Sequence, residues 1–72
     1  MIGAEAGEKR TIVYGQREVS YRLFFLKRKT IEIAVHPDGR VVVKAPIDTD
    51  FSLVEQRVLK RARWIFRQVD YF

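Results

Sequence analysis

Short stretches in which apolar and polar residues alternate fill the first two thirds of this chain, and a longer stretch with a helical period follows them. Alternation is typical of β-strands, because successive side chains of a strand point to opposite faces of a sheet. The pattern predicts strands over residues 11–14, 18–27, 30–36 and 40–45. In the second strand, Val19, Tyr21, Leu23 and Phe25 would share one face. Apolar residues also reach its other face near the end, at Phe24 and Leu26.

Pro37-Asp38-Gly39 gives the clearest turn signal in the sequence. Proline presets φ near −65°, aspartate hydrogen-bonds to nearby backbone, and glycine accepts positive φ. Residues 30–45 therefore read as a β-hairpin with Ile31, Ile33 and Val35 facing inward. The adjacent cations Lys27, Arg28 and Lys29 repel one another and favour a solvated turn before this hairpin.

The last part of the chain predicts one amphipathic helix over residues 53–69. Ser52 and Glu55 have the spacing of a capping box at its start. When successive residues are placed about 100° apart around a helix axis, the apolar residues form one stripe. It comprises Val54, Val58, Ala62, Ile65 and Val69, and is widened by Leu59 and Phe66. This stripe is expected to cover the sheet.

These elements predict an α+β fold: an antiparallel sheet of three or four strands with one C-terminal helix packed on one face. Residues 1–9 are small and polar, and we expect them to form a flexible tail. Residues 10–72 would form a single small domain, because a chain of 72 residues allows no more.

Composition excludes several kinds of chemistry. The chain has no cysteine, which rules out disulfides and thiolate metal sites, and its one histidine, His36, cannot build a zinc site alone. We expect His36 to be a solvated turn residue, and we assign no catalytic, metal or cofactor residue. No apolar run reaches the length of a membrane span, and no signal peptide opens the chain. A cytoplasmic protein without a membrane partner is expected.

The polar face of the predicted helix is strongly basic, in a chain with net charge +5. A candidate partner surface follows from it: Arg57, Lys60, Arg61, Arg63, Trp64 and Arg67, with Lys27, Arg28 and Lys29 as further members. Lys60 and Arg67 have the spacing to reach the Trp64 ring. The face could be merely solvated, with arginine stems shielding the indole. It could bind a protein, or nucleic acid through base stacking and phosphate contacts.

The order of the motifs resembles the N-terminal part of the YgjP-like predicted zinc metallopeptidases, also described as predicted metal-dependent hydrolases. A Lys/Arg cluster leads into Thr-Ile-x-Ile-x-Val, then Pro-Asp-Gly, Val-Val-Val, Ala45-Pro46, a helix start at Ser52 and Trp64-Ile65. The resemblance covers about residues 18–69. It implies a larger protein, in which a following region carries an H-E-x-x-H helix and a further histidine that bind zinc.

None of those zinc ligands matches a position of this chain. The resemblance therefore implies a non-catalytic N-terminal domain, which supports the catalytic region or positions substrate and is inactive alone. Its partner would be the catalytic region of the same protein or another protein. A free-standing basic module that binds nucleic acid is the alternative, and a small homodimer formed through a strand edge or helix face is a third possibility.

Overall fold

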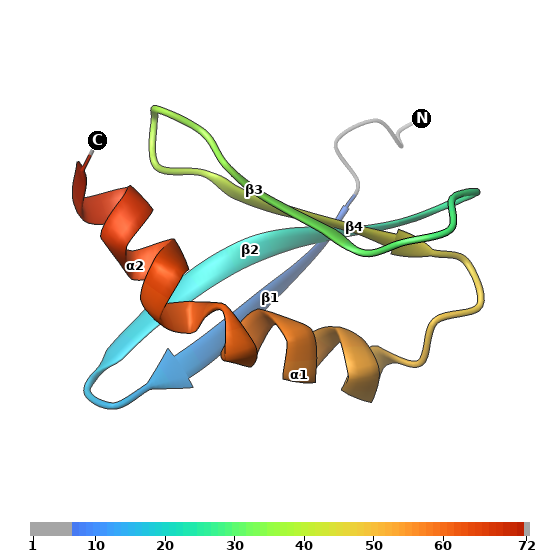
Figure 1. Ribbon diagram of the computed structural model, residues 1–72, viewed down its shortest axis with the longest axis horizontal. Coiled ribbons are helices and arrows are strands. Elements are labelled where there is room, and N and C mark those ends of the chain that lie inside the picture. Colours follow the sequence, from blue (N-terminus) through green and yellow to red (C-terminus); the bar gives the residue numbers. More distant parts are fainter. Residues whose placement is uncertain (1–6, 72) are drawn as a thin grey trace.

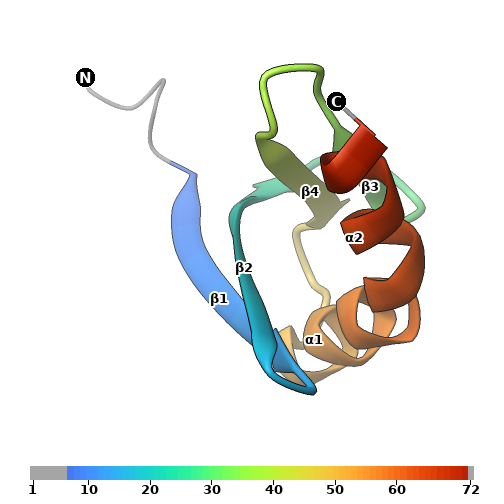
Figure 2. The same ribbon diagram turned by 90° about the vertical axis from the view of Figure 1, so that its left-hand side faces the viewer.

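The computed structural model describes residues 7–71. Four strands are followed by two helices, and the helices lie on one face of the sheet (Figures 1 and 2). The elements are β1 (Glu8–Tyr14), β2 (Arg17–Leu26), β3 (Glu32–Val35), β4 (Val41–Pro46), α1 (Phe51–Lys60) and α2 (Ala62–Tyr71). The predicted α+β class is confirmed. Of the predicted tail, residues 1–6 lie outside the described residues, while residues 8 and 9 already belong to β1.

The sheet is mixed, whereas the sequence predicted an antiparallel one. The strand order is β1-β2-β4-β3, with β1–β2 and β3–β4 antiparallel and β2–β4 parallel. The parallel pair arises because β4 lies between β2 and β3, so β3 with its two loops serves as the crossover connection. Leu26 lies beside Pro46 in this pair, so β2 and β4 terminate at the same end of the sheet.

The hairpin of β3 and β4 closes as predicted around Pro37-Asp38-Gly39. The Gly39 amide donates to the His36 carbonyl at 2.8 Å, and the His36 amide donates to the Arg40 carbonyl at 2.8 Å. Gly39 has φ +91°, which is the glycine conformation of a three-residue hairpin loop with a bulge. The Asp38 carboxylate accepts from the Arg40 amide, and this bond lowers the pKa of Asp38.

The helical segment differs from the predicted single helix. It begins at Phe51 after Asp50, whose carbonyl accepts the amides of Leu53 and Val54. No side chain of the described residues caps this end, so the predicted capping box at Ser52 is wrong: Ser52 already lies within the helix. Arg61, with φ −102° and ψ 11°, separates α1 from α2, and its amide is shared between the carbonyls of Arg57 and Val58.

The core lies between the helices and the inner face of the sheet. Val54, Val58 and Ile65 have no exposed surface, which confirms the phase of the predicted stripe. Leu59 does not belong to it, because 38% of its surface is exposed. From the strands, the core receives Ile12, Tyr21, Leu23, Val41, Val43 and Ala45. Among residues 7–71, no helix lies over the opposite face of the sheet (Figure 2).

Candidate partner-binding surface

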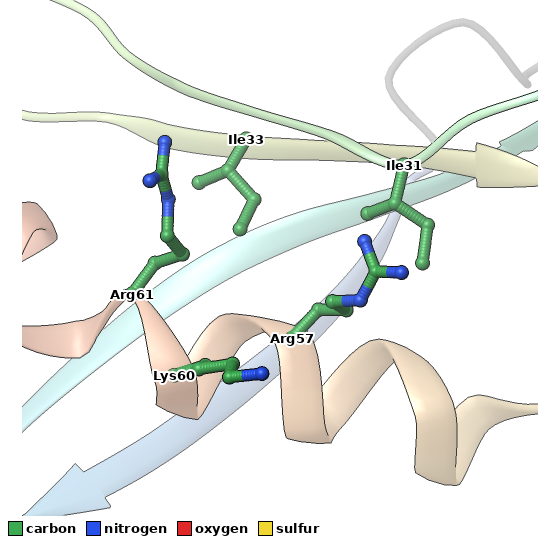
Figure 3. A pocket seen from close by; sticks show the side chains of 5 residues that line it. All are labelled: Ile31, Ile33, Arg57, Lys60 and Arg61. Carbon is green, nitrogen blue, oxygen red and sulfur yellow. The ribbon is translucent and has the colours of Figure 1, made fainter.

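A basic groove opens between β3 and the second half of α1. Ile33 of β3 and Ile31 just before β3 line it on one side, and Arg57 and Lys60 of α1 with Arg61 just after α1 line it on the other. The hollow has a volume of about 410 Å³. Figure 3 shows both guanidinium groups reaching from the helix toward the isoleucines, Arg57 toward Ile31 and Arg61 toward Ile33. We call these five residues the β3 groove.

The cations of the β3 groove have no acidic partner among residues 7–71. The ion pairs of this part of the chain lie elsewhere and join Arg10 to Glu8, Arg17 to Asp70, Arg28 to Glu32 and Arg40 to Asp38. Three positive charges beside two apolar side chains are suited to a ligand that combines carboxylate or phosphate groups with an apolar part.

Trp64 flanks this region but is only partly exposed. Its side chain packs against the core, and the guanidinium carbon of Arg61 lies 5.1 Å from the centre of its ring. The sequence had pointed to Lys60 and Arg67 as the ring's cationic neighbours, but Arg61 has that position. Trp64 is therefore neither deeply buried nor free on the polar face, and the guanidinium of Arg61 lies over its ring.

The remaining candidate residues are distributed over other parts of the surface. Arg63 and Arg67 are exposed on α2 and do not line the groove. Lys27, Arg28 and Lys29 lie in the loop after β2, as predicted. Arg28 pairs with Glu32 at 3.1 Å and donates to the Thr30 carbonyl at 2.8 Å. Lys29 and Arg57 line a second hollow of about 240 Å³ next to the β3 groove.

β2 and β4 end and α1 begins at the right of Figure 1, and exposed apolar residues occur in these segments. They are Phe25, Leu26, Ile47 and Leu53, which we call the apolar end. Ile47 is 61% exposed and Leu53 43% exposed. The alternation pattern placed Phe25 and Leu26 on the two faces of the predicted second strand but did not single out Ile47 or Leu53. Their signal was present, because Leu53 lies outside the apolar stripe and Ile47 follows the strand-ending Pro46.

The inner face near β1 holds a buried hydroxyl without a partner. Among the described residues, nothing hydrogen-bonds to the Tyr21 hydroxyl. Burial raises the pKa of Tyr21, and the negative charge of Glu55 adds to this shift. Arg10, opposite Tyr21 in the β1–β2 register, stacks its guanidinium 4.0 Å from the ring centre of Phe51. These contacts join β1 to α1.

The described residues contain no group of three histidine, cysteine, aspartate or glutamate side chains that could hold a metal ion. With no cysteine and one histidine in the whole chain, its donor set does not fit zinc, and we assign zinc to none of its residues. Within residues 7–71, no helix has the length and apolar character needed to cross a membrane. No family model, curated protein or solved structure matches this chain.

Proposed function

We propose that this chain is a non-catalytic domain of a predicted zinc-dependent metallopeptidase or metal-dependent hydrolase, and that it supports the catalytic region or positions substrate. The order of its motifs from the Lys/Arg cluster to Trp64-Ile65 supports this proposal. The H-E-x-x-H region would supply the zinc and the general base. The domain would supply a binding surface.

The observation that carries the proposal is the apolar end. Phe25, Leu26, Ile47 and Leu53 are exposed near one end of a domain whose core forms without them. Exposed apolar patches on small soluble domains mark surfaces that contact other proteins. Docking of the apolar end on the catalytic region would remove these side chains from water.

Two experiments test this proposal. The first reads the coding frame after Phe72, where an H-E-x-x-H run is expected. The second expresses that following region separately and measures its binding to the present chain by calorimetry. Leu53→Glu and Ile47→Glu should abolish binding, whereas Val13→Glu should not, because Val13 is 63% exposed on β1 away from the apolar end. Absence of an H-E-x-x-H run, or equal binding by all variants, contradicts the proposal.

A nucleic-acid-binding module is the second candidate. It is favoured by five helix cations without acidic partners among residues 7–71: Arg57, Lys60, Arg61, Arg63 and Arg67. Binding through phosphates would weaken steeply with salt. The test is a titration with duplex and single-stranded DNA at about 50 and 200 mM salt. No binding at the lower concentration, or binding that salt does not change, excludes this candidate.

A further inference from the structure

β3 forms an open edge of the sheet directly beside the β3 groove. It is the last strand in the order β1-β2-β4-β3. The His36 amide bonds to the Arg40 carbonyl, and hydrogen-bonded pairs alternate along an antiparallel ladder. With the register Ala34–Val42 and Ile33–Val43, the backbone of Ala34 therefore faces β4. The amide and carbonyl groups of Ile33 and Val35 face outward.

The two arginines of the groove have a spacing that matches an added strand. Arg57 in α1 and Arg61, directly after the end of α1, are four residues apart, which corresponds to about 6 Å along a helix. Side chains on one face of a strand recur every second residue, at about 6.6 Å. Ile31 and Ile33 have this spacing and point toward the helices, where they pack against the core. A strand paired with β3 would project alternate side chains into the same space.

We propose that the β3 groove binds an extended protein segment that pairs with β3 and carries two carboxylates two residues apart. The segment's backbone would bond with Ile33 and Val35, and its carboxylates would meet the guanidinium groups of Arg57 and Arg61. The residue between the carboxylates points to the uncovered face of the sheet. Recognition thus combines strand addition with charge-assisted hydrogen bonds.

Charge complementarity selects this occupant over a second copy of the chain. Two copies paired through β3 would bring their groove cations together, and like charges across an interface are unfavourable. A segment rich in Asp or Glu neutralises these cations instead. This inference does not depend on the proposed hydrolase, because the groove and the apolar end share no residue, although Leu53 lines the hollow next to the groove.

The probe is a fluorescein-labelled peptide with the sequence Thr-Glu-Val-Glu-Thr and a capped C-terminus. Its control, Thr-Val-Glu-Glu-Thr, has the same composition but adjacent carboxylates, which would point to opposite faces of a strand. Binding is measured by fluorescence anisotropy at about 50 mM salt, where surface charges are weakly screened. The first peptide should bind at least tenfold more tightly than the second. Amide hydrogen exchange at Ile33 and Val35 should slow when the first peptide binds.

The protein variants distinguish binding in the β3 groove from nonspecific attraction to the positive charge of the surface. Arg57→Ala/Arg61→Ala should weaken binding about tenfold or more, as expected for two lost charge-assisted contacts. The control Arg63→Ala/Arg67→Ala removes the same charge at the same spacing outside the groove, and should change binding less than threefold. Circular dichroism checks that both variants fold. Equal losses in both variants, equal affinity for both peptides, unchanged exchange at Ile33, or a dimer in sedimentation would each overturn the proposal.

Discussion

The guanidinium of Arg17 donates two hydrogen bonds to the carboxylate of Asp70, at 2.9 and 3.0 Å. Arg17 opens β2 and Asp70 lies in the last turn of α2, so the pair joins parts of the chain that are far apart in sequence. The same guanidinium lies 4.5 Å from the centre of the Phe66 ring, and Tyr14 packs on that ring at 6.1 Å. The end of α2 is thereby fixed to the loop between β1 and β2.

This pair predicts an acid-dependent loss of stability. The hydrogen bond from Arg17 lowers the pKa of Asp70 in the folded state below the value of about 3.9 for an unfolded aspartate. The stability that the Arg17–Asp70 pair contributes is therefore complete above about pH 4. It is lost as the pH falls through the lower pKa that Asp70 has in the folded state. Asp70→Asn should lower the urea midpoint slightly at pH 7, because the pair is solvent-exposed. The difference between the two midpoints should be smaller at pH 2 than at pH 7.

Glu18→Gln provides the control for this comparison. Glu18 is exposed on β2 and pairs with no cation among the described residues, so its removal changes net charge without breaking a bond. It should leave the midpoint at pH 7 nearly unchanged. An Asp70→Asn deficit that persists undiminished at pH 2 would show that the carboxylate is not its source.

Tyr21→Phe is expected to leave stability unchanged or to raise it by about 1 kcal/mol, because it removes a buried hydroxyl that has no hydrogen-bond partner among residues 7–71. Burial raises the pKa of Tyr21, so the unfolded tyrosine ionises first as pH rises. The wild-type chain then loses stability above about pH 10, and the variant lacks this loss. Urea titrations at pH 7 and above pH 10 measure both effects. A loss above about 1 kcal/mol at pH 7 would mean that the hydroxyl holds a bond.

The fold class and the buried face of the helices could be predicted because they depend on side-chain period alone. Val58 and Ile65 lie where a 100° helical repeat places them, and the Pro37-Asp38-Gly39 turn formed where its residues favour it. The groove could be predicted only in part. Arg57, Lys60 and Arg61 were identified as a basic face, but their convergence on Ile31 and Ile33 depends on which strand lies beside α1.

The parallel pairing of β2 with β4 could not be predicted. Alternation shows which side chains share a face of a strand, but it does not show which strands lie next to each other. The helix break at Arg61 has no local signal either, because the sequence there contains neither proline nor glycine. Tertiary contacts accompany it: α1 contacts β1 whereas α2 contacts β3. The wrong prediction of a capping box at Ser52 has a similar origin. The turn after Pro46 is short enough that the helix already starts at Phe51.

Gly39→Val should destabilise the hairpin by about 1–3 kcal/mol through backbone strain. A Cβ at position 39 would meet no atom within 4 Å, so crowding at the Cβ is not the cause. The cost comes from φ +91°, which a β-branched residue resists. Gly39→Asn should cost less, because asparagine tolerates positive φ better. Thermal unfolding of both variants tests this order, and equal melting temperatures would contradict it.

Ile65 and Leu59 provide the sharpest test of helix phase, because both lie on the apolar stripe predicted from sequence but only Ile65 is buried. Ile65 has no exposed surface, so Ile65→Ala should cost about 2–5 kcal/mol and can unfold so small a domain. Leu59→Ala should cost less than about 1 kcal/mol, since much of that side chain is already in water. Urea denaturation followed by circular dichroism measures both. Equal losses would place Leu59 in the core and shift the face that α1 presents to the sheet, and with it the position of Arg57 and Arg61 beside β3.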